Sequence, residues 1–127
     1  MYKELSICII IIIVIFSLDL YTQNYTKKSV SIINEQLMEL KDIIFQKDKD
    51  NMLKKANELD FSWKKLHDRL AYYIEHDELE KVDTAIVTMI SYIENSDYSS
   101  ALADLDKGKF ILEHIQDKYA FNIQNIF

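Results

Sequence analysis

The sequence predicts an all-α protein in which one N-terminal transmembrane helix is followed by an up-and-down bundle of three or four helices. Three observations support this fold class. An uninterrupted apolar run lies close to the N-terminus. The chain has one glycine and no proline, two residues on which the turns of sheet proteins depend. The remaining sequence repeats apolar residues three and four positions apart, which is the spacing of amphipathic helices.

The apolar run extends from Leu5 to Leu18 and is followed by Asp19. A helix of this length spans about 21 Å, or about 25 Å with the next apolar residues, against a hydrocarbon core of about 30 Å. Local thinning of the bilayer absorbs such a mismatch. We therefore predict a membrane anchor within residues 1–24, formed by these apolar positions: Leu5, Ile7, Ile9, Ile10, Ile11, Ile12, Ile13, Val14, Ile15, Phe16 and Leu18.

An uncleaved anchor is favoured over a cleaved signal peptide, which is the alternative for a run this short. Cleavage requires small residues at two flanking positions, and the best candidate segment, residues 15–17, offers only one. Tyr2, Tyr21 and Tyr25 flank the run, as aromatic residues do at membrane interfaces.

The positively charged residues on the two sides of the run are nearly balanced, with Lys3 before it and Lys27 and Lys28 after it. The position of the run near the N-terminus resembles an export signal. We therefore expect a bacterial single-pass cell-membrane protein whose body, residues 25–127, lies outside the cytoplasm.

The composition of the body limits its class. About 100 residues remain after the anchor, which is enough for one domain. The net charge of −6 argues against binding to nucleic acid. The single cysteine, Cys8, lies in the anchor, so no disulfide is expected in the body.

The body contains four amphipathic segments. The first two are predicted at about residues 27–46 and 51–75. The apolar pattern then changes register near Asp77, which we interpret as the N-cap of a third helix, with Glu80 completing a capping box. The predicted core comprises Val30, Ile33, Leu37, Leu40, Ile44, Leu59, Trp63, Leu66, Leu70, Leu79, Val82, Ile86, Ile90, Ile93, Leu105, Leu112 and Ile115.

A loop rich in capping residues occupies positions 95–100, and the fourth helix is predicted at about residues 99–122. Gly108 falls on its inner side, where the missing side chain allows a close helix approach at a cost of about 1 kcal/mol in helix propensity. The C-terminal tail is apolar and is expected to dock on the bundle or to face the membrane, through Phe121, Ile123, Ile126 and Phe127.

The sequence contains no established catalytic or metal-binding motif, so we predict no enzymatic activity, no metal and no cofactor. His76 and Glu80 are one helical turn apart, but no glutamate precedes a histidine by three residues, as a di-iron bundle requires. His67 and His114 complete no such site. A phosphate-binding loop needs several glycines, and Gly108 stands alone.

Aromatic residues of the body could line a ligand pocket, but the helical spacing of Trp63, Tyr73 and Tyr119 favours packing in the core. The full set comprises Phe61, Trp63, Tyr72, Tyr73, Tyr92, Tyr98 and Tyr119.

Three segments resemble a known family. They are residues 61–66 (FSWKKL), residues 73–79 (YIEHDEL) and residues 122–127 (NIQNIF). Together with the N-terminal anchor, they resemble the Firmicute family of domain of unknown function 4363. The resemblance implies a small membrane-anchored helical protein and no catalytic residue.

The function favoured by these observations is that of a non-enzymatic accessory or scaffold module, which packs on another membrane protein or on itself. The alternative is a sensor-like ligand-binding bundle without an output domain, with a pocket near Tyr72, Tyr73, Tyr92 and His76. A third class, a metal-dependent enzyme, would require bound metal.

Overall fold

The structure, a computed structural model, describes the backbone of residues 1–124 and the side chains of residues 1–119. Within this range it contains four helices and no strand: α1 (Tyr2–Gln46), α2 (Lys49–Leu70), α3 (His76–Glu94) and α4 (Tyr98–Gln124). The predicted all-α class, with a long apolar N-terminal helix followed by a bundle, is confirmed. The expected placement of the tail side chains Phe121, Ile123, Ile126 and Phe127 lies outside the described residues.

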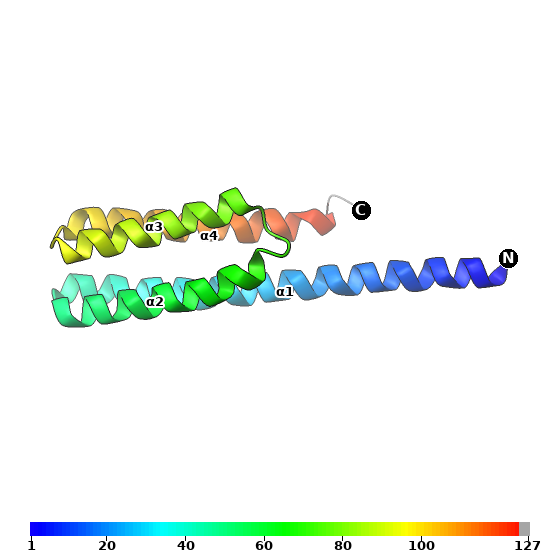
Figure 1. Cartoon of the computed structure of the whole chain (residues 1–127), viewed down its shortest axis with the longest axis horizontal. Helices are drawn as coiled ribbons and strands as arrows, with labels where there is room; N and C mark the ends of the chain where they lie inside the picture. The colour runs from blue at the N-terminus through cyan, green and yellow to red at the C-terminus, as the bar shows by residue number, and fades with distance from the viewer. Residues whose placement is uncertain (125–127) are drawn as a thin grey trace.

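The four helices form an up-and-down bundle (Figure 1). α1 packs against α2 and α4, and α3 packs against the same two helices. The turns between α1 and α2 and between α3 and α4 lie at one end of the bundle, where the Lys49 ammonium donates a hydrogen bond to the Ser96 hydroxyl at 3.1 Å. The α2–α3 turn, residues 71–75, lies at the opposite end, from which α1 continues outwards.

The core is the shared centre of the four helices, and it is built from the amphipathic stripes of the sequence. The structure buries all the residues of the predicted core set except Leu66 and Ile90, which are half-buried against it. Met52, Ala56, Ile74, Met89 and Ala101 are also buried. Trp63 is the largest of the fully buried side chains.

α1 is one helix of 45 residues, in which the apolar anchor and the first helix of the bundle are continuous. The segment between them, residues 19–26, contains neither glycine nor proline. Its threonines keep their hydroxyls bonded within the helix: Thr22 Oγ1 donates to the Asp19 carbonyl oxygen at 2.9 Å, and Thr26 Oγ1 donates to the Thr22 carbonyl oxygen at 2.7 Å. The anchor therefore joins the bundle without a hinge.

Two helix limits differ from those predicted. α2 ends at Leu70 rather than near residue 75, and α3 begins at His76 with Glu75 as its N-cap. The prediction of Asp77 as the N-cap is therefore wrong, because Asp77 already lies in the first turn, where its charge still favours the helix dipole. The turns also use non-glycine residues in the left-handed region, namely Lys47 (φ 59°) and Ser96 (φ 60°).

Candidate functional site

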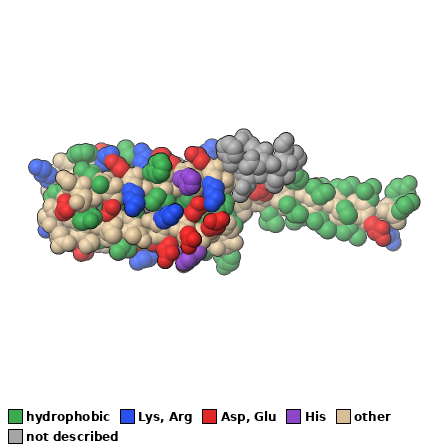
Figure 2. Space-filling view, turned by 90° about the horizontal axis from the view of Figure 1, so that it is seen from above, with side chains coloured by type: hydrophobic (Ala, Val, Ile, Leu, Met, Phe, Trp, Pro, Cys, Tyr) green, Lys and Arg blue, Asp and Glu red, His purple; other side chains and the backbone are tan. Residues whose placement is uncertain are grey.

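The first distinctive surface is the part of α1 that projects beyond the bundle. The apolar residues of the predicted anchor are all exposed, with Ile11 at 52% and Ile12 at 50%. Figure 2 shows hydrophobic side chains covering this projection, whereas the visible face of the bundle carries charges of both signs. α1 is the one helix in the described part of the chain that is long and apolar enough to cross a membrane.

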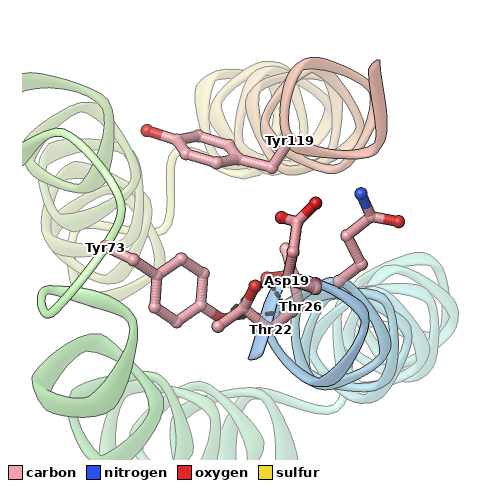
Figure 3. Close-up of a pocket in the computed structure, with 6 residues that line it drawn as sticks. Asp19, Thr22, Thr26, Tyr73 and Tyr119 are labelled. Atoms are coloured by element: carbon pink, nitrogen blue, oxygen red, sulfur yellow. Dashed lines mark hydrogen bonds between the residues drawn. The ribbon is translucent and has the colours of Figure 1, made fainter. Parts of the chain in front are cut away.

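The second distinctive feature is a polar pocket of about 160 Å³ at the end of the bundle from which α1 emerges. Its walls come from α1, the α2–α3 turn and α4 (Figure 3). The lining residues are Asp19, Thr22, Gln23, Thr26, Tyr73 and Tyr119. The pocket therefore lies next to the start of the apolar projection, and we call it the junction pocket.

Tyr73 fastens the α2–α3 turn to α1. Its hydroxyl lies 2.7 Å from Thr26 Oγ1 and 3.3 Å from the carbonyl oxygen of Thr22. Thr26 donates its own proton to the Thr22 carbonyl oxygen, so it can accept the proton of the Tyr73 hydroxyl. Burial raises the pKa of Tyr73 above its usual value, and the hydrogen bond with Thr26 opposes this effect.

Tyr119 closes the same pocket from α4. Its ring contacts that of Tyr73 edge to face, with 6.4 Å between the centroids. Its hydroxyl accepts a hydrogen bond of 2.9 Å from the backbone N–H of Glu75. That N–H belongs to the N-cap of α3, so Tyr119 also fixes the start of that helix.

The remaining wall of the junction pocket offers an acceptor and a donor. Asp19 is half-buried and extends from α1 towards α4 in Figure 3. The buried Gln23 Nε2 atom has no hydrogen-bond partner among the described residues. Such a pair can bind a small group that both donates and accepts hydrogen bonds.

Two further polar clusters connect neighbouring helices of the bundle. The buried Trp63 indole N–H donates to Asp83 Oδ1, and His67 Nε2 lies 3.3 Å from Asp83 Oδ2, so α2 and α3 share this carboxylate. Between α3 and α4, Lys118 lies 3.0 Å from the buried Glu78. The hydrogen bond with Glu78 raises the pKa of Lys118.

Of the residues considered for a ligand pocket, Tyr73 and Tyr119 meet in the junction pocket, but the others do not line it. Tyr72 and His76 are exposed at the α2–α3 turn, whereas Tyr92 lies on the last turn of α3. The distance from His76 to Tyr92 along α3 is about 25 Å. The interpretation of Tyr92 as a neighbour of Tyr73 in one pocket is therefore wrong. Among the described residues, no group of three or more His, Cys, Asp or Glu is arranged to hold a metal ion.

The junction pocket was missed at the sequence level, although a signal for it exists. Stepping back from Ile33 by three or four residues along α1 reaches Val30, Thr26, Gln23 and Asp19. The inner stripe of α1 therefore continues towards the apolar projection with polar residues in place of apolar ones. A polar continuation of a core stripe predicts a polar, enclosed space at the end of a bundle.

Comparison with known proteins identifies the family. The family described as "Domain of unknown function (DUF4363)" matches residues 20–126, which is most of the chain. The chain therefore belongs to this family, and the resemblance seen in the sequence is confirmed. No curated protein and no solved structure matches the chain. The matched region begins at Leu20, close to where α1 enters the bundle.

Proposed function

We propose that this member of the DUF4363 family is a membrane-tethered, non-enzymatic module whose bundle binds another membrane protein or a second copy of itself. The observation that carries the proposal is the uninterrupted passage of α1 from an exposed apolar stretch into the bundle. A helix without a hinge presents the bundle to its neighbours at a fixed height and orientation. Such presentation suits an accessory or scaffold protein.

A groove between α3 and α4 supports the binding role. It has a volume of about 660 Å³ and is lined by Asp77, Glu80, Lys81, Thr84, Lys107, Phe110 and Ile111. Phe110 is 69% exposed, and Val87, one turn beyond Thr84 on α3, is 60% exposed. An exposed aromatic residue beside a groove with charges at its rim is a typical centre for a protein interface.

Photocrosslinking in native membranes tests this proposal. A benzophenone amino acid replaces Phe110, and the matched control replaces Phe61, an equally exposed phenylalanine on α2. We expect a defined crosslinked product from position 110 and none from position 61. A strictly monomeric protein in mild detergent, together with no product from either position, would refute the proposal.

The proposal also assigns the bundle to the outer side of the membrane. Addition of a protease to intact cells should then digest the bundle, whereas the same protease should find it protected if the bundle faces inwards. Digestion in broken cells is the control for protease activity.

A second candidate function, a ligand-binding sensor, is supported by the junction pocket with its unpartnered Gln23 amide. A thermal-shift screen of small polar molecules separates the two functions. A shift of several degrees that is lost in Gln23→Leu would favour the sensor.

A further inference from the structure

We propose that the end of the bundle from which α1 emerges is itself a lipid-contacting surface, seated in the headgroup layer of the membrane that holds the anchor. This inference rests on the tethering in the proposed function and adds a second contact with the bilayer. The surface, here called the rim, consists of Tyr21, Tyr25, Arg69 and Tyr72. Two of these residues come from α1, one from α2 and one from the α2–α3 turn.

The length of the apolar stretch determines the height of the rim. A hydrocarbon core of about 30 Å accommodates about 20 helical residues, and counting from Leu5 these end near residue 24. The bundle, however, already contacts α1 at Thr22, where the carbonyl oxygen lies 3.3 Å from the Tyr73 hydroxyl. Because α1 has no hinge, the bundle cannot move away from the bilayer. Its near end must therefore lie within the interfacial layer.

Thinning of the bilayer does not remove this contact. If the core thins to match the stretch that ends at Leu18, Thr22 lies about 6 Å beyond it along the helix axis. The headgroup layer on each side of a bilayer is about 5 to 8 Å thick. The α2–α3 turn lies at the level of Thr22 and Thr26, as the contacts of Tyr73 show. The turn thus reaches the headgroups in either case.

The chemistry of the rim suits this depth. Tyr72 is 90% exposed and Tyr21 is 67% exposed, although both are large aromatic residues. Tyr21 stacks on Tyr25, with 6.4 Å between the ring centroids, and Arg69 Nη1 donates a hydrogen bond to the Tyr25 hydroxyl at 3.4 Å. Tyrosine rings are favoured at the membrane interface, and a guanidinium group there can bind lipid phosphate.

A groove beside the rim adds further cations. It has a volume of about 640 Å³ and is lined by Tyr21, Asn24, Tyr25, Lys27, Lys28 and Ser31. Lysine side chains on this face can extend back towards the phosphates, because their aliphatic stems reach several ångströms along the helix. Although the chain carries a net charge of −6, this part of its surface is locally basic.

Depth-dependent fluorescence in vesicles tests the inference on the full-length protein. In a Cys8→Ser background, Tyr72→Cys carries an environment-sensitive NBD dye. The matched control is Tyr92→Cys, an exposed tyrosine near the far end of the bundle. Both proteins are reconstituted into phosphatidylcholine vesicles with or without a headgroup spin label. We expect a blue-shifted emission at position 72 and at least twofold stronger quenching than at position 92.

Flotation of the vesicles separates the two ways in which the inference could fail. Equal emission and equal quenching at both positions, in protein that floats with the vesicles, would overturn the rim as a lipid contact and leave the tether intact. Protein that does not float would overturn the tether and the rim together. Because Tyr72 is almost fully exposed, its substitution should not disturb the fold.

Discussion

In the first half of α1 the apolar side chains are exposed in every direction, whereas in the second half a stripe of apolar side chains on one side of the helix is buried. Ile11 and Ile12 are adjacent and about equally exposed, but Ile33 is fully buried while its neighbour Ile32 is 48% exposed. Both halves satisfy their backbone hydrogen bonds internally, as any helix does. This difference in side-chain distribution fits the proposed function, in which lipid surrounds the first half and protein covers one side of the second.

The largest effect should come from charges in the first, apolar half of α1. Replacing Ile11 and Ile12 with arginine costs about 6 to 8 kcal/mol of insertion free energy, from about 3 to 4 kcal/mol for each change. We expect the double variant to leave the membrane pellet for the high-speed supernatant. The matched control replaces Ile32 and Phe45, two exposed apolar residues of the second half, with arginine. A similar distribution of the two variants would erase the distinction between the halves.

The second prediction reverses the roles of the halves. Ile33→Ala removes buried apolar contacts and should lower the free energy of unfolding of the bundle by about 2 to 5 kcal/mol. Ile12→Ala, outside the bundle, should leave that free energy unchanged. The single tryptophan, Trp63, is buried in the core, so its fluorescence in mild detergent reports urea unfolding of the bundle alone. An equal decrease in the free energy of unfolding in both variants would contradict the proposal that Ile12 contacts lipid.

The same contrast explains which parts of the fold could be predicted from the sequence. Residues such as Ile33, Leu37 and Leu40 could be identified as core residues, because a helix that faces water on one side carries its apolar residues in a periodic stripe on the other. The limits at the α2–α3 turn were less accurate, because residues 71–75 include no glycine, no proline and no residue in the left-handed region that would mark the end of a helix. The change of register near residue 77 located the α2–α3 turn, but not the cap.

The junction pocket depends on information that no single segment carries. Tyr73, Tyr119 and Asp19 meet because the packing of all four helices brings α1, α4 and the α2–α3 turn to the same level. The Trp63 indole likewise finds its acceptor on Asp83, twenty positions away on another helix. Polar partners of this kind follow from tertiary alignment and not from local periodicity.

The third prediction concerns the boundary between the halves. Tyr73→Phe removes the hydroxyl that contacts Thr26 and should lower the stability of the bundle by about 0.5 to 1.5 kcal/mol at neutral pH. Because the pKa of Tyr73 is raised in the folded state, its contribution is complete below the unfolded value of 10.0 and is lost as the pH rises through the folded value.

The pKa of Lys118 is also raised in the folded state, so its contribution to stability is likewise lost as the pH rises above its unfolded pKa of 10.5. The wild-type bundle should therefore weaken above about pH 10, and Tyr73→Phe should weaken less over that interval. Urea midpoints at pH 8 and pH 11 measure the difference. Tyr72→Phe, an exposed neighbour, is the control, and an alkaline loss that is identical in wild type and Tyr73→Phe would exclude Tyr73 as a source.

The smallest expected effect comes from Gly108 in the bundle, where substitutions separate the contribution of helix packing from that of helix propensity. Gly108 is buried on α4 against α3, but a Cβ atom there would meet the Ala85 Cβ at 3.6 Å, an ordinary contact distance. The close approach therefore leaves room for alanine, and Gly108→Ala should stabilise the bundle by about 0.5 to 1 kcal/mol. Gly108→Leu should instead destabilise it by about 1 to 3 kcal/mol through overpacking. Destabilisation by alanine as well would show that the α3–α4 contact, and not the helix propensity of α4, limits the stability of the bundle.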